Sequence, residues 1–250
     1  MNRKNIVAED FREFVKGKKF STILADPPWQ FQNRTGKMAP EHKRLSRYPT
    51  LTLDEIKTIP VHEAATDTAH LYLWVPNALI AEGLEVLKAW GFKYKTNLIW
   101  YKTRKDGGPD RRGVGFYFRN VTEVILFGVK GKNARTLKPG RSQENIIVQR
   151  KREHSRKPDE QYKIIELCSK GPFLEMFARG SRLNWITWGN QAVDYYPKWK
   201  TYKNHSQNGQ SKMQAVIHKP YKDSSTKQLV LLERKKNYKS RVFKKNLAVK

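Results

Sequence analysis

The sequence predicts an α/β protein with a doubly wound, mostly parallel sheet that carries helices on both faces. Over the first 194 residues, apolar runs of strand length alternate with helical segments, which is the pattern of parallel strands joined by crossover helices. The chain has 250 residues, 38% of them hydrophobic, enough for one such domain with a full core and an appendage.

Six segments have the apolar, aromatic and β-branched composition of buried strands. In chain order they are Phe20–Ala25, Ala69–Val75, Tyr94–Tyr101, Val121–Val129, Phe173–Phe177 and Trp185–Trp188. Two helices are expected between them. The first covers about 78–90 and is stopped by Gly91, and the second begins at Pro158 and runs to about Lys170.

The uneven distribution of charge divides the chain into residues 1–194 and a basic extension, residues 195–250. The extension holds 15 Lys/Arg and 2 Asp/Glu, a net of +13, whereas residues 1–194 hold 35 and 21, a net of +14. Two interpretations stay open. The extension is either a nucleic-acid-binding arm, with lysines on phosphates and aromatics on bases, or a partly disordered, solubilising tail.

The net charge of +27 points to a polyanionic partner, with nucleic acid as the first candidate and an anionic membrane surface as the second. No apolar stretch is long enough to span a bilayer, and we find no convincing basic amphipathic helix. The polar N-terminus is unlike a signal peptide. We therefore expect a cytoplasmic protein, a monomer or a homodimer, that binds nucleic acid and not membranes.

Cys168 is the only cysteine, so no intramolecular disulfide can form. It lies in an apolar, helical pattern and is expected in the core rather than as a nucleophile. One cysteine and scattered histidines also argue against a structural zinc site, and no metal is expected.

The strongest candidate for a functional site is the tetrapeptide Asp26-Pro27-Pro28-Trp29, which directly follows the first predicted strand. Open α/β sheets bind their ligands at the carboxyl ends of the strands, where Asp26 lies. The two prolines lack backbone donors, so their carbonyls can only accept hydrogen bonds. A carboxylate, two such carbonyls and an indole suit a planar ring that bears an amino group, and adenine is the obvious ring.

Three further segments have the character of a cofactor site, although each alone fits a structural role as well. Lys157 stands beside a predicted helix start, a suitable place for a carboxylate or phosphate. Glu175 and Arg179 lie on and just after a strand that ends in a tight turn, where they can hold ribose hydroxyls. Asn190 and Gln191 place two amides after the last strand, within reach of a sugar or an adenine edge.

Together these segments resemble the adenine amino-methyltransferases, the MT-A-seventy-like family. The motifs that carry the resemblance, in family order, are Asp26–Trp29, Tyr48–Thr50, Leu73–Val75, Ile99–Thr103, Val129–Gly131, Lys157–Glu160, Glu175–Arg179 and Asn184–Gln191. Eukaryotic members methylate adenosine in messenger RNA, and bacterial and phage members methylate adenine in DNA. The resemblance covers roughly residues 18–192.

The resemblance implies a Rossmann-like fold with S-adenosylmethionine as methyl donor, and a permuted order in which the catalytic motif precedes the cofactor strand. It implies that Asp26 holds the target amino group and lies close to the methionine part of the donor. Lys157 would then pair with the methionine carboxylate. The remaining implied cofactor contacts, to the ribose side, are Glu175, Arg179, Asn190 and Gln191. Some relatives carry an asparagine where this chain has Arg182, so the chain departs from the family pattern at one expected ribose contact.

The nucleic-acid substrate is expected to contact a target pocket and a basic loop. The resemblance implies that Tyr48 and Trp100 line the pocket. The loop from Lys102 to Arg119 can grip the backbone that flanks the target base, and its cations are Arg104, Lys105, Arg111 and Arg112. A mobile, solvated loop is the alternative.

We expect an adenine-specific DNA methyltransferase of a bacterium or phage. Two alternatives stay open: the same methylation of adenosine in RNA, and a non-catalytic nucleic-acid-binding subunit. The absence of an obvious RNA-binding module in the sequence favours DNA over RNA. The intact Asp-Pro-Pro-Trp motif counts against the non-catalytic subunit, because partners of that kind usually lose it.

Overall fold

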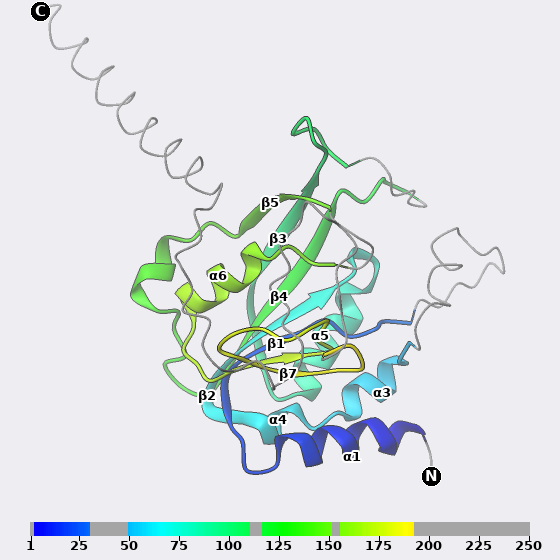
Figure 1. The fold of residues 1–250 in the computed structure, drawn as a ribbon, viewed down its shortest axis with the longest axis vertical. Helices are drawn as coiled ribbons and strands as arrows, with labels where there is room; N and C mark the ends of the chain where they lie inside the picture. Colours follow the sequence, from blue (N-terminus) through cyan, green and yellow to red (C-terminus); the bar gives the residue numbers. More distant parts are fainter. Residues whose placement is uncertain (1–2, 31–49, 111–116, 152–155, 193–250) are drawn as a thin grey trace, which may run out of the picture. The chain divides into compact units, whose positions relative to one another are not determined.

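A seven-stranded sheet forms the centre of the fold in the computed structural model, which describes residues 3–30, 50–110, 117–151 and 156–192 (Figure 1). The strands are β1 Phe20–Ala25, β2 Ala65–Val75, β3 Lys93–Thr103, β4 Thr122–Lys130, β5 Ile146–Arg150, β6 Phe173–Met176 and β7 Trp185–Trp188. Their order across the sheet is β5-β3-β4-β2-β1-β6-β7. Tyr48, Arg111, Arg112 and the extension 195–250 lie outside the described residues.

The sheet is mostly parallel, as the sequence predicts. Strand β1 pairs in parallel with β2 and β6, β6 with β7, and β3 with β5. Strand β4 is antiparallel to both of its neighbours, β2 and β3. The other described strands therefore all end at one edge of the sheet, called here the carboxyl edge.

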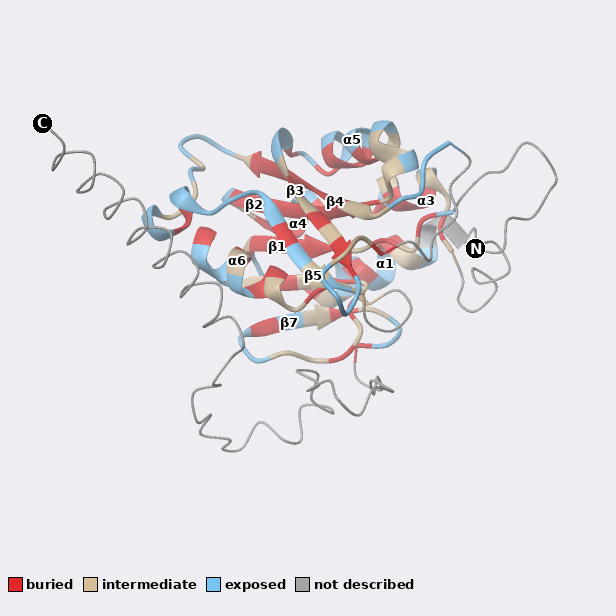
Figure 2. Ribbon diagram, turned by 90° about the horizontal axis from the view of Figure 1, so that it is seen from above, coloured by how far each residue is buried: buried red, intermediate tan, exposed pale blue. Residues whose placement is uncertain are grey.

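Alternate residues of the central strands enter two separate cores, because both faces of the sheet are covered. Ile23, Leu71 and Leu174 belong to the first core, whereas Leu24 and Tyr72 belong to the second. The buried residues, red in Figure 2, accordingly form continuous stretches along these strands. Such strands read as unbroken apolar runs in the sequence, which is why they were predictable.

Helices from the first part of the chain cover the first core. They are α1 Arg3–Val15, α3 Leu53–Thr58, α4 Val61–Ala64 and α5 Ile80–Ala89. Phe11, Ile56 and Val86 contribute their buried side chains to this core. On the other face, α6 Glu160–Cys168 buries Tyr162 and Ile165. The described residues also include two 3-10 helices, Asn77–Leu79 and Lys138–Ser142.

Several elements differ from the sequence-based expectation. The helix expected over 78–90 is a 3-10 turn followed by α5, and β2 begins at Ala65 instead of Ala69. Helices α1, α3 and α4 and strand β5 were not predicted. The signal for α3 was present, because Thr52 and Glu55 form a capping box: the Glu55 amide donates to Thr52 Oγ1 (3.2 Å) and the Thr52 amide to Glu55 Oε2 (2.7 Å).

Gly131 directly follows β4, and the structure gives the reason for a glycine there. Its backbone has φ of 82°, and a Cβ at this position would lie 2.2 Å from the Asp67 carbonyl oxygen. Only glycine fits so close an approach.

No helix in the described ranges is both long and apolar enough to cross a membrane.

Candidate active site at the carboxyl edge

The neighbouring strands β1 and β6 define the place where a ligand is expected. From β1 the chain continues to β2 on one side, and from β6 it continues to β7 on the other. This reversal is the topological switch point at which open α/β sheets bind ligands. Asp26 follows β1 here and Phe177 follows β6, with Ala25 and Met176 in register.

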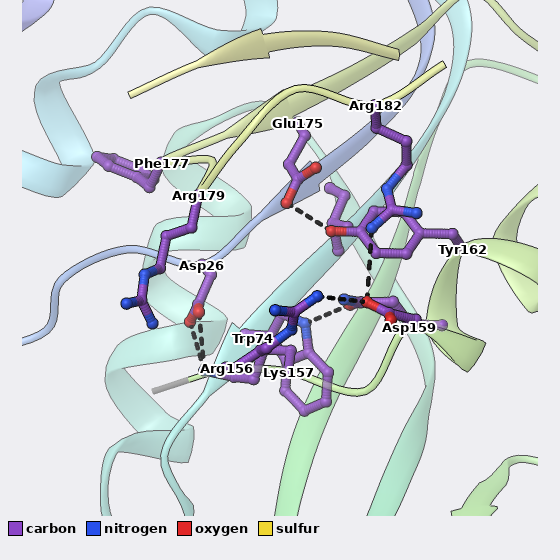
Figure 3. Close-up of a pocket in the computed structure, with 12 residues that line it drawn as sticks. Asp26, Trp74, Arg156, Lys157, Asp159, Tyr162, Glu175, Phe177, Arg179 and Arg182 are labelled. Atoms are coloured by element: carbon purple, nitrogen blue, oxygen red, sulfur yellow. Dashed lines mark hydrogen bonds and ion pairs between the residues drawn. The ribbon is translucent and has the colours of Figure 1, made fainter. Parts of the chain in front are cut away.

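A pocket opens at this switch point, and its lining is strongly charged (Figure 3). The lining residues are Leu24, Asp26, Trp74, Arg156, Lys157, Asp159, Gln161, Tyr162, Glu175, Phe177, Arg179 and Arg182. The cavity measures about 50 Å³. Sites for drug-sized ligands measure about 300–1,000 Å³, so a ligand of cofactor size requires some of the ion-paired side chains to move.

An ion pair joins Asp26 to Lys157, 131 residues further along the chain. Lys157 Nζ lies 2.9 Å from Asp26 Oδ1 and 2.8 Å from Oδ2. It also lies 3.5 Å from Glu123 Oε2 and 5.1 Å from the centre of the Trp74 ring. Burial raises the pKa of Asp26 although Lys157 opposes the change, so the charged carboxylate is held there at a cost.

Glu123 and Lys102 extend this ion pair into a chain of alternating charges. Lys102 Nζ contacts Glu123 Oε1, and the Lys102 side chain is only 9% exposed. Burial raises the pKa of Glu123, but Lys157 and Lys102 more than offset this, so the pKa is lowered and the carboxylate stays charged. Neither residue was a sequence-based candidate.

A second buried network forms the opposite wall of the pocket. Tyr162 donates a hydrogen bond from its hydroxyl to Glu175 Oε1 (2.7 Å). The Arg182 guanidinium lies 3.3 Å from the centre of the Tyr162 ring and 3.5 Å from Asp159 Oδ1. Arg156 also pairs with Asp159, at 3.6 Å. Figure 3 shows these side chains facing Asp26 across the pocket.

Glu175 is expected to make a pH-dependent contribution to the stability of the fold. Burial raises its pKa from an ordinary 4.5 to about 7. A carboxyl with a raised pKa in the folded chain stabilises the fold when protonated, so this contribution is complete below pH 4.5 and is lost as the pH rises to about 7. Glu175→Gln stays neutral and should remove this loss. Urea unfolding of both chains across this range tests it, and identical pH profiles would contradict it.

The turn after β6 is held in a strained form. Phe177 adopts a left-handed backbone with φ of 59°, which costs about 1–3 kcal/mol for such a residue. The Ala178 amide donates to the Trp188 carbonyl at 2.9 Å. At Gly189 a Cβ would lie 2.7 Å from the Ala178 nitrogen, so the turns after β6 and β7 pack backbone to backbone. This packing places Arg179 at the pocket.

The residues predicted to bind the cofactor fall into two groups. Lys157, Glu175 and Arg179 line the pocket together with Asp26. Gln191 lies just outside, where its Oε1 accepts a hydrogen bond from Arg179 Nε (3.1 Å). Asn190 is exposed and is not part of the lining.

The Asp-Pro-Pro-Trp carbonyls and indole are arranged differently from the expectation. The Pro27 carbonyl accepts from the Trp29 amide (2.8 Å), and the Pro28 carbonyl accepts from the Leu51 amide (2.9 Å). The Trp29 indole is 6% exposed and donates to the Trp74 carbonyl (2.9 Å). Each carbonyl keeps one lone pair, but the indole presents no free face for stacking in this arrangement.

Trp100 also departs from its expected place. It is 2% exposed, its indole donates to the Gln149 carbonyl (3.0 Å), and its ring meets the edge of Trp74. It therefore supports the pocket wall from behind instead of lining it. Arg104 and Lys105 are exposed on the loop after β3, as a backbone-gripping role requires.

A doubly wound, mostly parallel sheet with a charged pocket at its switch point is the architecture of the Rossmann-like methyltransferases that use S-adenosylmethionine. Residues 20–191 match the family model described as MT-A70. The chain therefore belongs to the MT-A70 family, whose members use S-adenosylmethionine as methyl donor.

The chain is similar to relatives from eukaryotes and bacteria. It is 37% identical over 179 residues to the N(6)-adenosine-methyltransferase catalytic subunit METTL3 of Homo sapiens, covering 69% of this chain and 28% of that protein. It is 36% identical over 177 residues to the MT-A70-like protein of Drosophila melanogaster (69% and 27%). It is 29% identical over 196 residues to the type II methyltransferase M.MunI of Mycoplasma sp (71% and 79%). The chain thus spans about a quarter of the length of these eukaryotic relatives. A bacterial or phage origin stays a prediction.

The chemistry of the pocket fits S-adenosylmethionine. Lys157, Arg156 and Arg179 offer cations for a carboxylate, and Glu175 offers an acceptor for hydroxyl groups. Arg182 supplies an independent indication, since its buried Nε has no hydrogen-bond partner among the described residues. Buried donors are rarely left unpaired, so a polar ligand atom near Arg182 is consistent with this pocket.

Proposed function

We propose that this chain transfers a methyl group from S-adenosylmethionine to the exocyclic 6-amino group of adenine in DNA. The observation that carries the proposal is the Asp26 carboxylate, placed at the switch point and held by Lys157. A carboxylate is an acceptor-only group suited to the two hydrogens of an aromatic amine.

The reaction needs alignment more than a strong base. The lone pair of the adenine amino nitrogen is delocalised into the ring, so the nitrogen is a poor nucleophile. Asp26 would accept an amino hydrogen and increase the electron density on nitrogen. S-adenosylmethionine supplies a methyl group that is already electrophilic because it is bound to a sulfonium sulfur. The N–C bond would form as the S–C bond breaks, with S-adenosylhomocysteine as the leaving group, and the acidified nitrogen would then lose its proton to water.

Lys157 has a further part in this proposal. In the structure it occupies both oxygens of Asp26. If its ammonium pairs with the methionine carboxylate instead, the Asp26 oxygens become available to the target amine. Glu175 and Arg179, with Gln191 beside it, would hold the ribose side. The carbonyls of Pro27 and Pro28 would use their remaining lone pairs.

DNA is favoured because the chain covers 79% of the length of M.MunI, a type II methyltransferase. RNA is the second candidate, supported by the higher identity to METTL3, 37% against 29%. In duplex DNA the target base must leave the stack, at a cost of about a few kcal/mol.

We propose that the phosphates are contacted by the extension 195–250 and by the loop cations Arg104, Lys105, Arg111 and Arg112. Tyr48 is proposed to line the target pocket. We also propose a cytoplasmic location in a bacterium or a phage-infected host.

Transfer of tritiated methyl groups to oligomers tests the function. The purified chain is incubated with labelled S-adenosylmethionine and with DNA or RNA of the same sequence. The matched control replaces adenine by purine, which lacks only the amino group. We expect label in adenine-containing DNA and none in the control. Faster transfer to RNA would select the second candidate, and no transfer to any oligomer with intact cofactor binding would indicate a non-catalytic subunit.

A further inference from the structure

Two adjacent aromatic side chains are the most exposed large hydrophobic groups of the described residues. Tyr117 is 94% exposed and Phe118 is 85% exposed. Among the described residues, the next most exposed large hydrophobic side chain is Leu183, at 56%. Scattered exposed apolar residues are ordinary, but two neighbouring rings that are almost fully in water indicate a surface that meets a partner.

The loop that carries these rings is anchored at the carboxyl edge of the sheet. They lie in the connection from β3 to β4, and this connection leaves and re-enters the sheet at that edge. The Lys102 amide donates to the Val121 carbonyl (2.8 Å), which closes the base of the loop. Asn77, just after β2, donates to Asn120 Oδ1 (3.4 Å) and to the Thr122 carbonyl (3.3 Å).

The same connection links the rings to the pocket. Glu123 follows Phe118 by five residues and is the member of the charge chain that contacts Lys157 at 3.5 Å. Lys157 in turn holds Asp26. The rings therefore belong to a connection that leads directly into β4, and β4 holds Glu123 against Lys157 of the pocket.

The loop that carries the rings is rich in cations. Arg104, Lys105 and Arg119 belong to the same loop and are exposed. Arg104 is partly fixed by Asp106, whose carboxylate lies 2.8 Å from its Nη2. Exposed aromatics among cations suit single-stranded or distorted nucleic acid, because every base offers a ring face and every nucleotide a phosphate.

We propose that Tyr117 and Phe118 stack on the nucleobases that flank the target adenine, an inference that rests on the proposed function. Bases next to an extruded nucleotide lose a stacking neighbour. An aromatic ring at the same edge of the sheet as the pocket can replace that neighbour and hold the strand with the target base turned towards Asp26. The two residues are positioning residues for the substrate and take no part in the chemistry.

Paired substitutions in the full chain separate stacking from simple apolar contact. One variant carries Tyr117→Leu and Phe118→Leu, which keep an apolar surface without a ring. The control carries Tyr117→Phe and Phe118→Tyr, which keep both rings. We expect the leucine variant to raise the KM for the oligomer by about 10- to 100-fold, the range that base–aromatic stacking provides, while the control stays within about twofold.

Two further measurements identify the contact as stacking. The fluorescence of 2-aminopurine placed next to the target adenine should fall when the unmodified chain or the control binds, and should stay high with the leucine variant. The slope of log affinity against log salt should be the same in all three chains, since no cation is removed. Calorimetry should give one affinity for S-adenosylmethionine in all three.

Distinct outcomes would overturn the inference. A leucine variant with unchanged KM and unchanged quenching would show that the rings do not meet bases. A change of oligomeric state in sedimentation, with oligomer binding unchanged, would assign the rings to a protein contact. Failure of methyl transfer to all nucleic acids would refute the proposed function, but the fluorescence of bound 2-aminopurine oligomers would still report on stacking.

Discussion

Asp26→Asn is expected to lower the rate of methyl transfer by on the order of 10³-fold while leaving the fold intact. The asparagine amide has the size of the carboxylate but no charge, and it presents an amino group of its own to the target. Removing one preorganised hydrogen-bonding group from an active site, such as an oxyanion-hole donor, typically costs about 10²–10³ in kcat. In this chain the same side chain also sets the position of Lys157, so the larger value is expected.

The stability of this variant is the more specific part of the prediction. Burial raises the pKa of Asp26, which means that the folded chain holds the charged carboxylate at a cost. Asp26→Asn should therefore melt at the same temperature as the unmodified chain or above it. Asp67→Asn, an exposed position at the start of β2, is the matched control and should keep normal turnover. An Asp26→Asn chain with near-normal transfer, or one that unfolds, would contradict the proposed role.

The residues brought together at the pocket show what a sequence can and cannot reveal. Asp26 and Lys157 are 131 residues apart, yet each was recognisable because each stands beside a strand end or a helix start. Open α/β sheets gather such positions at one edge. Glu123 and Lys102 lacked such a signal. A charged residue at a strand end is ordinarily solvated, and only the pairing of β3 with β4 brings the buried Lys102 ammonium against the half-buried Glu123 carboxylate.

Tryptophans were the least predictable members of the site. Trp29 and Trp100 were expected to face a target base, and both are buried in the cores. A large aromatic ring after a strand suits a ligand or a core equally well, and the tertiary packing around it decides which role it takes.

Helix α1 was missed although Phe11 and Val15, at a spacing of four, mark its buried face.

Lys157→Met is expected to weaken both the affinity for S-adenosylmethionine and the stability of the fold. Loss of a charge-assisted hydrogen bond of about 1.5–3 kcal/mol to the methionine carboxylate should weaken the affinity for S-adenosylmethionine by about 10- to 100-fold. The fold should also lose stability, because Asp26 keeps its charge without its partner. The Asp26 side chain is 33% exposed, so we expect about 1–3 kcal/mol, below the full value for a buried pair.

The pH dependence and a second substitution identify the cause of this loss. Lys157 opposes the rise in the pKa of Asp26 that burial produces, so its removal raises that pKa further. A carboxyl with a raised folded pKa stabilises the fold below its unfolded pKa and loses this contribution as the pH rises. The stability difference between Lys157→Met and the unmodified chain should therefore grow from about pH 4 upward.

Adding Asp26→Asn should restore most of the stability but not the cofactor affinity, whereas Lys88→Met, exposed on α5, should change neither. A double variant as unstable as Lys157→Met alone would show that the lysine acts through packing and not through Asp26.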